Sequence, residues 1–478
     1  MKKIITKKRV TLLFLLTILV IVCIAIGIYQ NYKPLPEGIS YESEIHNAEH
    51  IELLTDLTYN NFNDVTIYEQ DIFAEVFDII EEAEDFIVID MFLFNSYTDQ
   101  NKDFPDLSGE LTKKLIKQKE QHPDMTVVFI TDPINTGYHS YKDEHIKLLE
   151  EHDIEVVITN LDKLKDSNKA YTSVWRLLFQ PFGQSGTGWL PNPFAKEAPK
   201  FTLRSYLALF NVKANHRKAV ITEKCAIVTS ANPHNESGFA SNIGFKVSGN
   251  IIRDMVKAEQ AVIDYSNGKT IIPLPKKEKA KETDTNVQYI TEGKILKHVV
   301  KELEETEKGD TVWIAMFYLA NRDIIDALHD ATERGVEVNF ILDPNKVAFG
   351  NGKTGLPNVP IASELIKNKH INIRWFQAEE NQFHTKLLYI NKGENSVIIG
   401  GSANYTTRNL NDLNLENNLK ISAPTEVKIM QDTEEYFQRL WNNEDGEFTS
   451  PYEANEDELT PILKLTYWVQ KLSGLTTY

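Results

Sequence analysis

Cysteine is nearly absent from this 478-residue chain, which holds only Cys23 and Cys225. Cys23 lies inside a long apolar run and Cys225 lies in a segment with the pattern of a buried strand, so we expect no disulfide between them. A disulfide-held scaffold is thereby excluded. A zinc site is not expected, because no cysteine pair exists and the histidines lack ligand spacing. We predict neither a metal nor any other cofactor.

Basic charge is also scarce, with 51 Lys and Arg against 69 Asp and Glu and a formal net charge of −18. Residues 1–33 hold six basic side chains and no acid, so the rest of the chain is still more acidic. Proteins that bind nucleic acids usually present a basic surface, because neutralising phosphates supplies much of their affinity. We therefore expect no nucleic acid as a partner.

Long apolar runs are missing except near the start, where residues 10–29 form a nearly unbroken run of 20. That is about the length that a helix needs to cross a bilayer. Five basic residues precede the run, which predicts a cytoplasmic N-terminus and places the rest of the chain outside the cytoplasm. A cleaved signal peptide is the alternative, but no small-x-small cleavage site follows. We predict a single-pass anchor in the cell membrane.

The rest of the chain contains one plan twice. In each half a strand pattern is followed by a helical pattern, a second strand that ends in Asp-Pro, another helix and a third strand. The matching segments are 86–95 and 311–320, 108–122 and 323–334, 125–132 and 336–343, and 154–159 and 371–376. This order predicts two similar α/β halves, an internal duplication, each around a mostly parallel sheet.

The domain organisation follows from this repeat. We predict a basic tip and transmembrane helix at 1–33, a first half at 34–265, a linker at 266–286, a second half at 287–445 and a C-terminal extension at 446–478. The linker is assigned because 266–286 is rich in Lys, Glu, Thr and Pro and has little to bury.

The first half is longer than the second by an insertion at about residues 160–210. This insertion is rich in aromatic residues, and between positions 176 and 204 the basic residues Arg176, Lys196, Lys200 and Arg204 face a single acid, Glu197. Two roles stay open for the aromatic side chains. They could form core, or they could lie at the membrane interface while the basic side chains meet anionic lipid.

An H-x-K motif follows the third strand of each half, and a hairpin pattern follows each motif. Alternation along the first hairpin strand places His and Lys on one face, and the return strand brings Ser and Asn beside them. The candidate catalytic residues are His216, Lys218, Asn232, His384, Lys386 and Asn404, supported by Ser230 and Ser402. Such a set suits phosphoryl transfer without a metal, because one imidazole can attack phosphorus while another protonates the leaving alcohol.

These motifs resemble the phospholipase D superfamily, whose signature is H-x-K, an acid and G-[GS]-x-N. The second copy, FHTKLLYI followed by GGSANYTTRNL, matches closely, and the first, NHRKAVI followed by TSAN, matches more loosely. The resemblance covers about residues 50–445. It implies that both halves pack around one active site in a single chain, so that a monomer suffices. It also implies a covalent phosphohistidine, with the other histidine as acid and then base.

Two positions depart from the family pattern. Where the family has Asp seven residues after the histidine, this chain has Glu223 and Asn391, and we predict Glu223 and Glu416 as further supporting residues of the site. Glu416 matches the acid that holds the nearby histidine in the family, whereas Asn242 stands where relatives often have Asp. By analogy with two-copy members, His216 is the expected nucleophile.

The anchor, the aromatic and basic insertion and the acidic remainder favour a phospholipid at the membrane surface as substrate. The predicted enzyme is a membrane-anchored phospholipase D-type phosphodiesterase or transphosphatidylase acting on glycerophospholipids. Transfer to water would make it a phospholipase D, and transfer to phosphatidylglycerol a cardiolipin synthase. An exported nuclease is one alternative, and a basic groove leading to the histidines would support it. A catalytically inactive surface protein, with its two motif histidines too far apart to share a phosphate, is the other.

Overall fold

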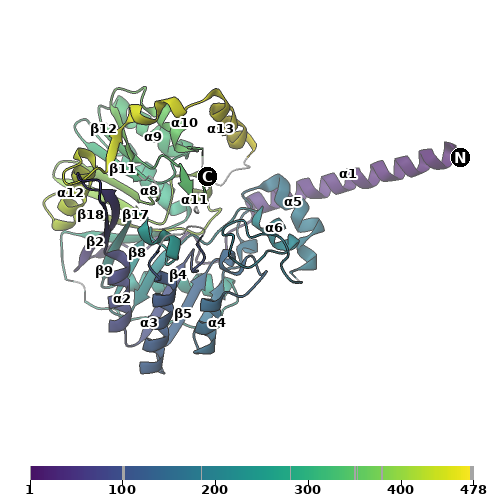
Figure 1. Ribbon diagram of the computed structural model, residues 1–478, viewed down its shortest axis with the longest axis horizontal. Coiled ribbons are helices and arrows are strands. Elements are labelled where there is room, and N and C mark those ends of the chain that lie inside the picture. Colours follow the sequence, from purple (N-terminus) through teal and green to yellow (C-terminus); the bar gives the residue numbers. More distant parts are fainter. Residues whose placement is uncertain are drawn as a thin grey trace.

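A computed structural model describes residues 2–98, 103–184, 186–279, 281–348, 351–352, 354–377 and 381–473. Figure 1 shows two α/β halves against each other and a long helix, α1 (Lys2–Tyr32), that projects from the first half. Within Lys8–Tyr32 of α1 an 18-residue stretch has a mean hydropathy of 3.1, and the segment is long and apolar enough to span a membrane.

The first half is built on a sheet with the strand order β3-β2-β9-β8-β7-β4-β5-β6. Its strands are β2 (Ile51–Asn60), β3 (Thr66–Gln70), β4 (Phe86–Met91), β5 (Thr126–Thr131), β6 (Glu155–Ile158), β7 (Lys218–Thr222), β8 (Cys225–Thr229) and β9 (Asn242–Ser248). The pairings β4–β5 and β5–β6 are parallel, and the other strand pairings that the structure describes in this sheet are antiparallel.

The second half repeats this arrangement in the order β1-β10-β18-β17-β16-β11-β12-β15-β19. Its strands are β1 (His46–Asn47), β10 (Asn286–Thr291), β11 (Thr311–Met316), β12 (Glu337–Leu342), β15 (Ile371–Phe376), β16 (Lys386–Asn391), β17 (Asn395–Gly401), β18 (Asn417–Pro424) and β19 (Thr449–Pro451). The pairings β11–β12 and β12–β15 are parallel. A small separate ladder joins β13 (Val347–Ala348) to β14 (Asn351–Gly352).

The prediction of two similar α/β halves is confirmed, but the prediction of mostly parallel sheets is wrong. Only the strand–helix–strand units give parallel pairs, since a helical crossover returns the chain in the same direction. The hairpin that follows each H-x-K motif and the strand after it add antiparallel ladders on the other side of β4 and β11. Each sheet is therefore mixed, with its three parallel strands next to one another.

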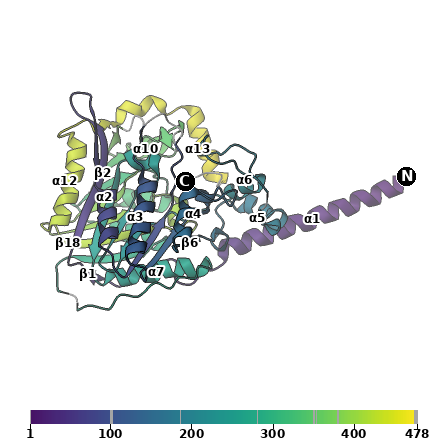
Figure 2. The same cartoon turned by 60° about the horizontal axis from the view of Figure 1, so that its bottom comes forward.

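Helices cover the outer faces of both sheets, as Figure 2 shows for α2, α3 and α4. The helices of the first half are α2 (Ile72–Glu82), α3 (Leu107–Gln121), α4 (Glu144–Glu151) and α7 (Ile251–Tyr265), and those of the second are α8 (Gly293–Glu304), α9 (Arg322–Glu333), α10 (Asn358–Leu365), α11 (Thr407–Leu410) and α12 (Lys428–Asn442). Both helices predicted from the repeat begin at a side-chain cap, Asp106 for α3 and Asn321 for α9.

The two halves share one core between their sheets. A single cluster of buried side chains includes Val228 and Phe245 of the first sheet and Ile398 and Leu419 of the second. The sheets approach so closely that a Cβ on Gly400 would come within 2.7 Å of the Phe245 ring. This packing brings the two H-x-K segments to one interface.

Segments near both ends of the chain join the second half, outside the domains predicted for them. The short strand β1 lies in the predicted first half but pairs with β10 of the second sheet. The predicted extension likewise joins the second half, where β19 pairs with β15 and α13 (Pro461–Ser473) packs near α10 with Leu463 buried.

The insertion forms a small subdomain next to α1. It contains α5 (Lys169–Leu178), the single turn η3 (Gln180–Phe182) and α6 (Leu203–Leu209). Its interior is a cluster around Phe201, which contacts Tyr138 and Tyr141 of the first half by ring packing. The subdomain therefore packs against the loop that follows β5, at the same edge of the sheet as the H-x-K motif.

Candidate active site

The two motif histidines face each other across the interface of the halves. His216 lies two residues before the start of β7, and His384 lies two residues before the start of β16. The backbone N–H of His216 donates to Leu415 O at 2.9 Å, and that of His384 donates to Ser241 O at 2.8 Å. Each histidine is thus held by the opposite half, and the ring centroids lie 6.5 Å apart.

Each imidazole has its hydrogen-bond partner in the other half. His216 Nδ1 lies 2.9 Å from Glu416 Oε2, and His384 Nδ1 lies 3.1 Å from Asn242 Oδ1. The Asn242 amide donates from Nδ2 to Ala240 O, which leaves Oδ1 to accept from the histidine. Both imidazoles therefore carry the proton on Nδ1 and present Nε2 to the site.

The motif serines fix these partners. Ser402 Oγ donates to Glu416 Oε2 at 2.5 Å, and Ser230 Oγ donates to Asn242 Oδ1 at 3.0 Å. The side chains predicted as supporting residues are thus placed behind the histidines. They orient the rings rather than face a substrate.

The motif lysines lie beside the histidines in a repeated geometry. Lys218 Nζ donates to His216 O at 2.9 Å and lies 5.2 Å from the centre of the Phe92 ring. Lys386 Nζ donates to His384 O at 2.5 Å and lies 5.3 Å from the centre of the Phe317 ring. Both phenylalanines also contact the histidine rings of their own halves.

The motif asparagines lie just after the return strands of the two hairpins. Asn232 Oδ1 accepts from the Leu93 N–H at 3.3 Å. Asn404 Oδ1 is buried and has no hydrogen-bond partner among the described residues. A buried amide with an unused polar atom has bonding capacity for a ligand. Among the described residues no cluster of three or more His, Cys, Asp or Glu could hold a metal ion.

The electrostatics of this cluster favour an anion. Burial, followed by the charges of the two lysines, lowers the pKa of both His216 and His384 well below the usual value. Burial also lowers the pKa of Lys218 to about 7 and that of Lys386 well below its usual value. Four basic groups are thus confined together with Glu416, whose pKa burial raises to about 8. A bound phosphodiester would supply the negative charge that these basic groups lack.

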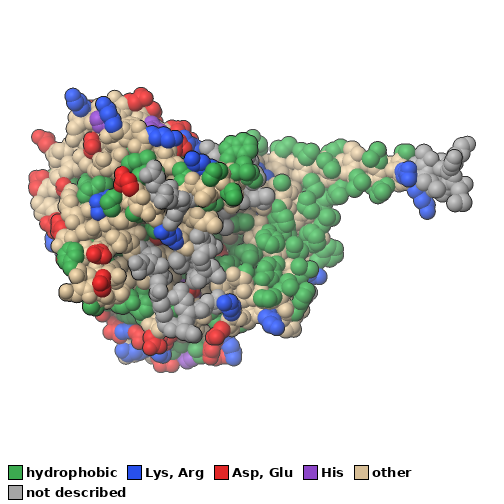
Figure 3. Space-filling model, turned by 45° about the horizontal axis from the view of Figure 1, so that its top comes forward, with side chains coloured by type: hydrophobic (Ala, Val, Ile, Leu, Met, Phe, Trp, Pro, Cys, Tyr) green, Lys and Arg blue, Asp and Glu red, His purple; other side chains and the backbone are tan. Residues whose placement is uncertain are grey.

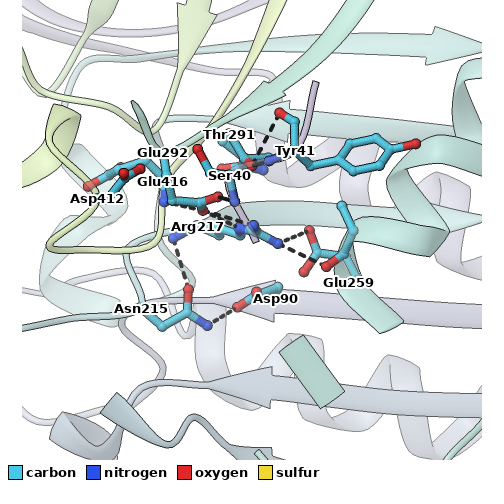
Figure 4. A network of polar contacts seen from close by, with 12 residues as sticks. Ser40, Tyr41, Asp90, Asn215, Arg217, Glu259, Thr291, Glu292, Asp412 and Glu416 are labelled. Atoms are coloured by element: carbon cyan, nitrogen blue, oxygen red, sulfur yellow. Dashed lines mark hydrogen bonds and ion pairs between the residues drawn. The ribbon is translucent and has the colours of Figure 1, made fainter. Parts of the chain in front are cut away.

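The middle residue of the first motif lies on the opposite face of the strand and enters a buried network, shown in Figure 4. The Arg217 guanidinium donates to Glu292 Oε1 at 3.0 and 2.8 Å and to Glu259 Oε1 at 3.2 Å. Glu292 Oε1 also accepts from the backbone N–H of Glu416 at 3.1 Å. Glu416, which orients His216, is therefore linked to the first motif by hydrogen bonds through Glu292 and Arg217.

Two buried aspartates brace the histidine segments from behind. Asp132 accepts from the Asn215 N–H, and Asp343 accepts from the Phe383 N–H, each at 2.7 Å. Burial raises the pKa of both carboxyl groups to about 7. The sequence pattern predicts these two residues only as strand ends. The signal that could have found them is the recurrence of Asp-Pro at the same point of each half.

Glu223 does not lie at the site, so its inclusion among the supporting residues is wrong. It lies in the turn between β7 and β8, where its carboxylate accepts from the backbone N–H groups of Glu84 and Phe86. Asn391, at the corresponding end of β16, contacts Glu434. Seven residues of hairpin carry the chain to the far end of the strand, away from the histidine.

The second half of the chain matches a known family. Residues 299–441 match the family model described as "Cardiolipin synthase, PLD-like domain". No curated protein sequence matches this chain.

Three solved structures are similar to this chain at low sequence identity, and one of them has a TM-score above 0.5. Phosphatidylserine synthase from Haemophilus influenzae Rd KW20 is 12% identical, with a TM-score of 0.53 over 93% of this chain and 97% of that chain. Polyphosphate kinase from Porphyromonas gingivalis is 12% identical, with a TM-score of 0.43 over 83% and 47%. The phospholipase D family member Nuc from Salmonella typhimurium is 19% identical, with a TM-score of 0.26 over 34% and 97%. The first likeness spans nearly all of both chains, so those two proteins share their overall fold. The family match confirms, for residues 299–441, the phospholipase D-like domain expected from the sequence, and the first structural likeness shows that the overall fold is shared.

Proposed function

We propose that this chain is a membrane-anchored enzyme that cleaves the phosphodiester bond of a glycerophospholipid and passes the phosphatidyl group to water or to an alcohol. One observation carries the proposal. His216 and His384, from different halves, lie with their ring centroids 6.5 Å apart between two buried lysines. One phosphodiester group can reach both rings at that separation, which is the arrangement that an inactive surface protein would lack.

In the first step His216 acts as the nucleophile. Its Nδ1–H donates to Glu416, so the Nε2 lone pair is free to attack phosphorus. The bond from phosphorus to the headgroup oxygen breaks, and His384, which becomes protonated on Nε2 once the anionic phosphodiester binds, gives that proton to the headgroup oxygen. Lys218 and Lys386 balance the charge on the phosphoryl oxygens. The products are a phosphatidyl-His216 and a free headgroup alcohol.

In the second step His384 acts as the base. Its neutral Nε2 takes a proton from water or an alcohol, whose oxygen attacks phosphorus and displaces His216. The partner of each ring suits its role. Glu416 steadies the positive charge that develops on the nucleophile, whereas the neutral amide of Asn242 leaves the His384 imidazolium acidic enough to give up its proton.

The roles of the histidines predict a pH effect. We expect Asn242→Asp to raise the pKa of His384, because a carboxylate near Nδ1 favours the imidazolium that burial and the lysines now disfavour. His384 would then stay protonated to higher pH. The falling limb of kcat/KM against pH should move up by about 1 to 2 pH units.

The mirror change, Glu416→Gln, is the matched control for that shift. It removes the carboxylate from His216, so it should lower kcat by about 10²-fold and leave the falling limb in place. A falling limb that moves with Glu416→Gln and stays fixed with Asn242→Asp would reverse the proposed roles.

The membrane placement is part of the proposal. Helix α1 would cross the cell membrane with its basic tip in the cytoplasm and leave both halves outside. Both motifs belong to one chain, so a monomer would hold a complete site. The remainder of the chain is acidic, which favours a phospholipid over a nucleic acid as substrate.

The direct test is incubation of the full chain in vesicles of phosphatidylglycerol and phosphatidylcholine, with products identified by mass spectrometry. The proposal predicts phosphatidic acid or cardiolipin, and the product names the acceptor. A His384→Ala chain should form neither. Intact lipids with the unchanged chain, together with cleavage of single-stranded DNA added in parallel, would replace the proposal with the nuclease alternative.

A further inference from the structure

The insertion exposes far more apolar surface than a folded subdomain requires. Its large apolar side chains that are exposed by 39% to 69% are Val174, Leu178, Phe179, Phe182, Trp189, Leu203 and Phe210. Figure 3 shows hydrophobic side chains gathered over this region, directly beside the root of α1. A concentration of exposed aromatic and aliphatic side chains marks a contact surface.

The position of α5 fixes what this surface faces. On α1 the less exposed residues Cys23, Ile26, Gly27 and Gln30 recur on one face, and α5 packs along that helix. A Cβ on Gly27 would lie 3.0 Å from Ser173 Oγ of α5. Gly27 precedes the end of α1 by about 7 to 8 Å at a rise of about 1.5 Å per residue. The neighbouring helix therefore lies level with the apolar span and not beyond its end.

Charge on the insertion matches a lipid surface. Residues 167–210 hold five basic side chains and one acid, within a chain whose net charge is −18. Lys196 and Lys200 are exposed, and Arg204 lies at the start of α6. An apolar surface with a cationic margin is the composition of segments that lie in the headgroup region of anionic membranes. A water-soluble protein partner would not explain why this surface lies level with the apolar span of α1.

We propose that the insertion is a bilayer-docking surface, in which α5 and η3 enter the leaflet beside α1 and the basic side chains meet anionic headgroups. Val212, at the end of the insertion, precedes His216 by four residues. Helix α13, on the α1 side of the second half in Figures 1 and 2, exposes Ile462 and Trp468 and would extend the surface. The docked insertion holds the site at the depth of lipid phosphodiesters. This inference rests on the proposed membrane span of α1 and not on the reaction.

Site-specific quenching tests the docking surface directly. The full chain carrying Cys23→Ala and Phe182→Cys would be labelled with an environment-sensitive fluorophore in vesicles of phosphatidylglycerol and phosphatidylcholine. Cys225 is buried, at 6% exposure, and should not react. The matched control is Phe62→Cys, because Phe62 is 63% exposed and lies in the β2–β3 turn. Lipids with a nitroxide on the acyl chain should quench the label at 182 and not the label at 62.

Two results would overturn the proposal. Quenching of the label at 182 by aqueous iodide to the same extent as at 62 would place the insertion in water. Protection from both quenchers would mean that a second copy or another protein covers it. Neither reading depends on turnover, so a failure here is distinct from a failure of the proposed reaction.

Activity supplies a second readout. Phe179→Gln combined with Phe182→Gln should raise the apparent KM for vesicle lipid about tenfold, because these two exposed aromatic side chains contribute apolar transfer energy only when they enter the bilayer. The rate with a short-chain lipid below its micelle concentration should not change. An unchanged KM for vesicles would contradict a docking role.

Discussion

Replacement of His216 by glutamine is expected to lower kcat toward a phospholipid by about 10⁴-fold or more, because His216 is the side chain that forms the covalent intermediate in the proposed mechanism. Glutamine keeps much of the shape of the imidazole and can still hydrogen-bond to Glu416, so the loss reports chemistry rather than unfolding. Steady-state rates on mixed micelles, with the melting temperature measured alongside, check this expectation.

His298→Gln is the matched control for this loss. His298 is also buried and also pairs with a carboxylate, since its Nε2 lies 3.1 Å from Glu42 Oε1, but it belongs to α8 away from the site. Its replacement should leave kcat within about twofold. Equal loss in both variants would show that the effect of His216→Gln is structural.

Replacement of Arg217 by methionine is expected to lower the free energy of unfolding by about 3 to 5 kcal/mol. Arg217 is fully buried and pairs with Glu292 and Glu259, as Figure 4 shows. Methionine fills much of the space but leaves two buried carboxylates without their cation. Their pKa values must then rise, or water must enter, and either change opposes folding. Urea denaturation in detergent measures the difference.

The internal repeat supplies the control. Thr385 is the middle residue of the second motif and is also fully buried, but its hydroxyl makes only long contacts, 3.5 Å to Ser241 O and 3.4 Å to Tyr436 Oη. Thr385→Val should therefore cost no more than about 1 kcal/mol. A similar small cost for Arg217→Met would mean that the network contributes little to holding the two halves together.

Local patterns predicted the repeated units well. The strands β4 and β11, the helices α3 and α9 and the hairpins after each motif all follow from hydrophobic periodicity, caps and turns, which are properties of neighbouring residues. The direction of β7 and β16 relative to β4 and β11 is a long-range property. The rule that a crossover helix gives parallel strands does not apply to strands joined by hairpins. Sequence periodicity therefore does not predict that each sheet is mixed.

The candidate residues were predictable as a set, but their pairing was not. The sequence presents Glu416 beside the second motif, whereas in the fold it contacts His216, which is 200 positions away. Asn242 contacts His384 in the same crossed manner. These pairs arise from the packing of one half against the other, which no spacing along the chain records. The prediction for Glu223 is wrong for a local reason, since the strand β7 separates the turn from the motif.

The central claim is that one phosphodiester bridges the two halves and becomes bonded to His216. Trapping tests it most directly, using the full His384→Ala chain and a phosphatidyl ester of p-nitrophenol, whose leaving group needs no proton. Without His384 to activate water, the intermediate should accumulate. Alkaline quenching preserves a phosphohistidine for digestion and mass spectrometry. The account predicts a phosphatidyl adduct on the peptide that contains His216. Release of p-nitrophenol with no adduct, or with an adduct on another residue, would contradict it.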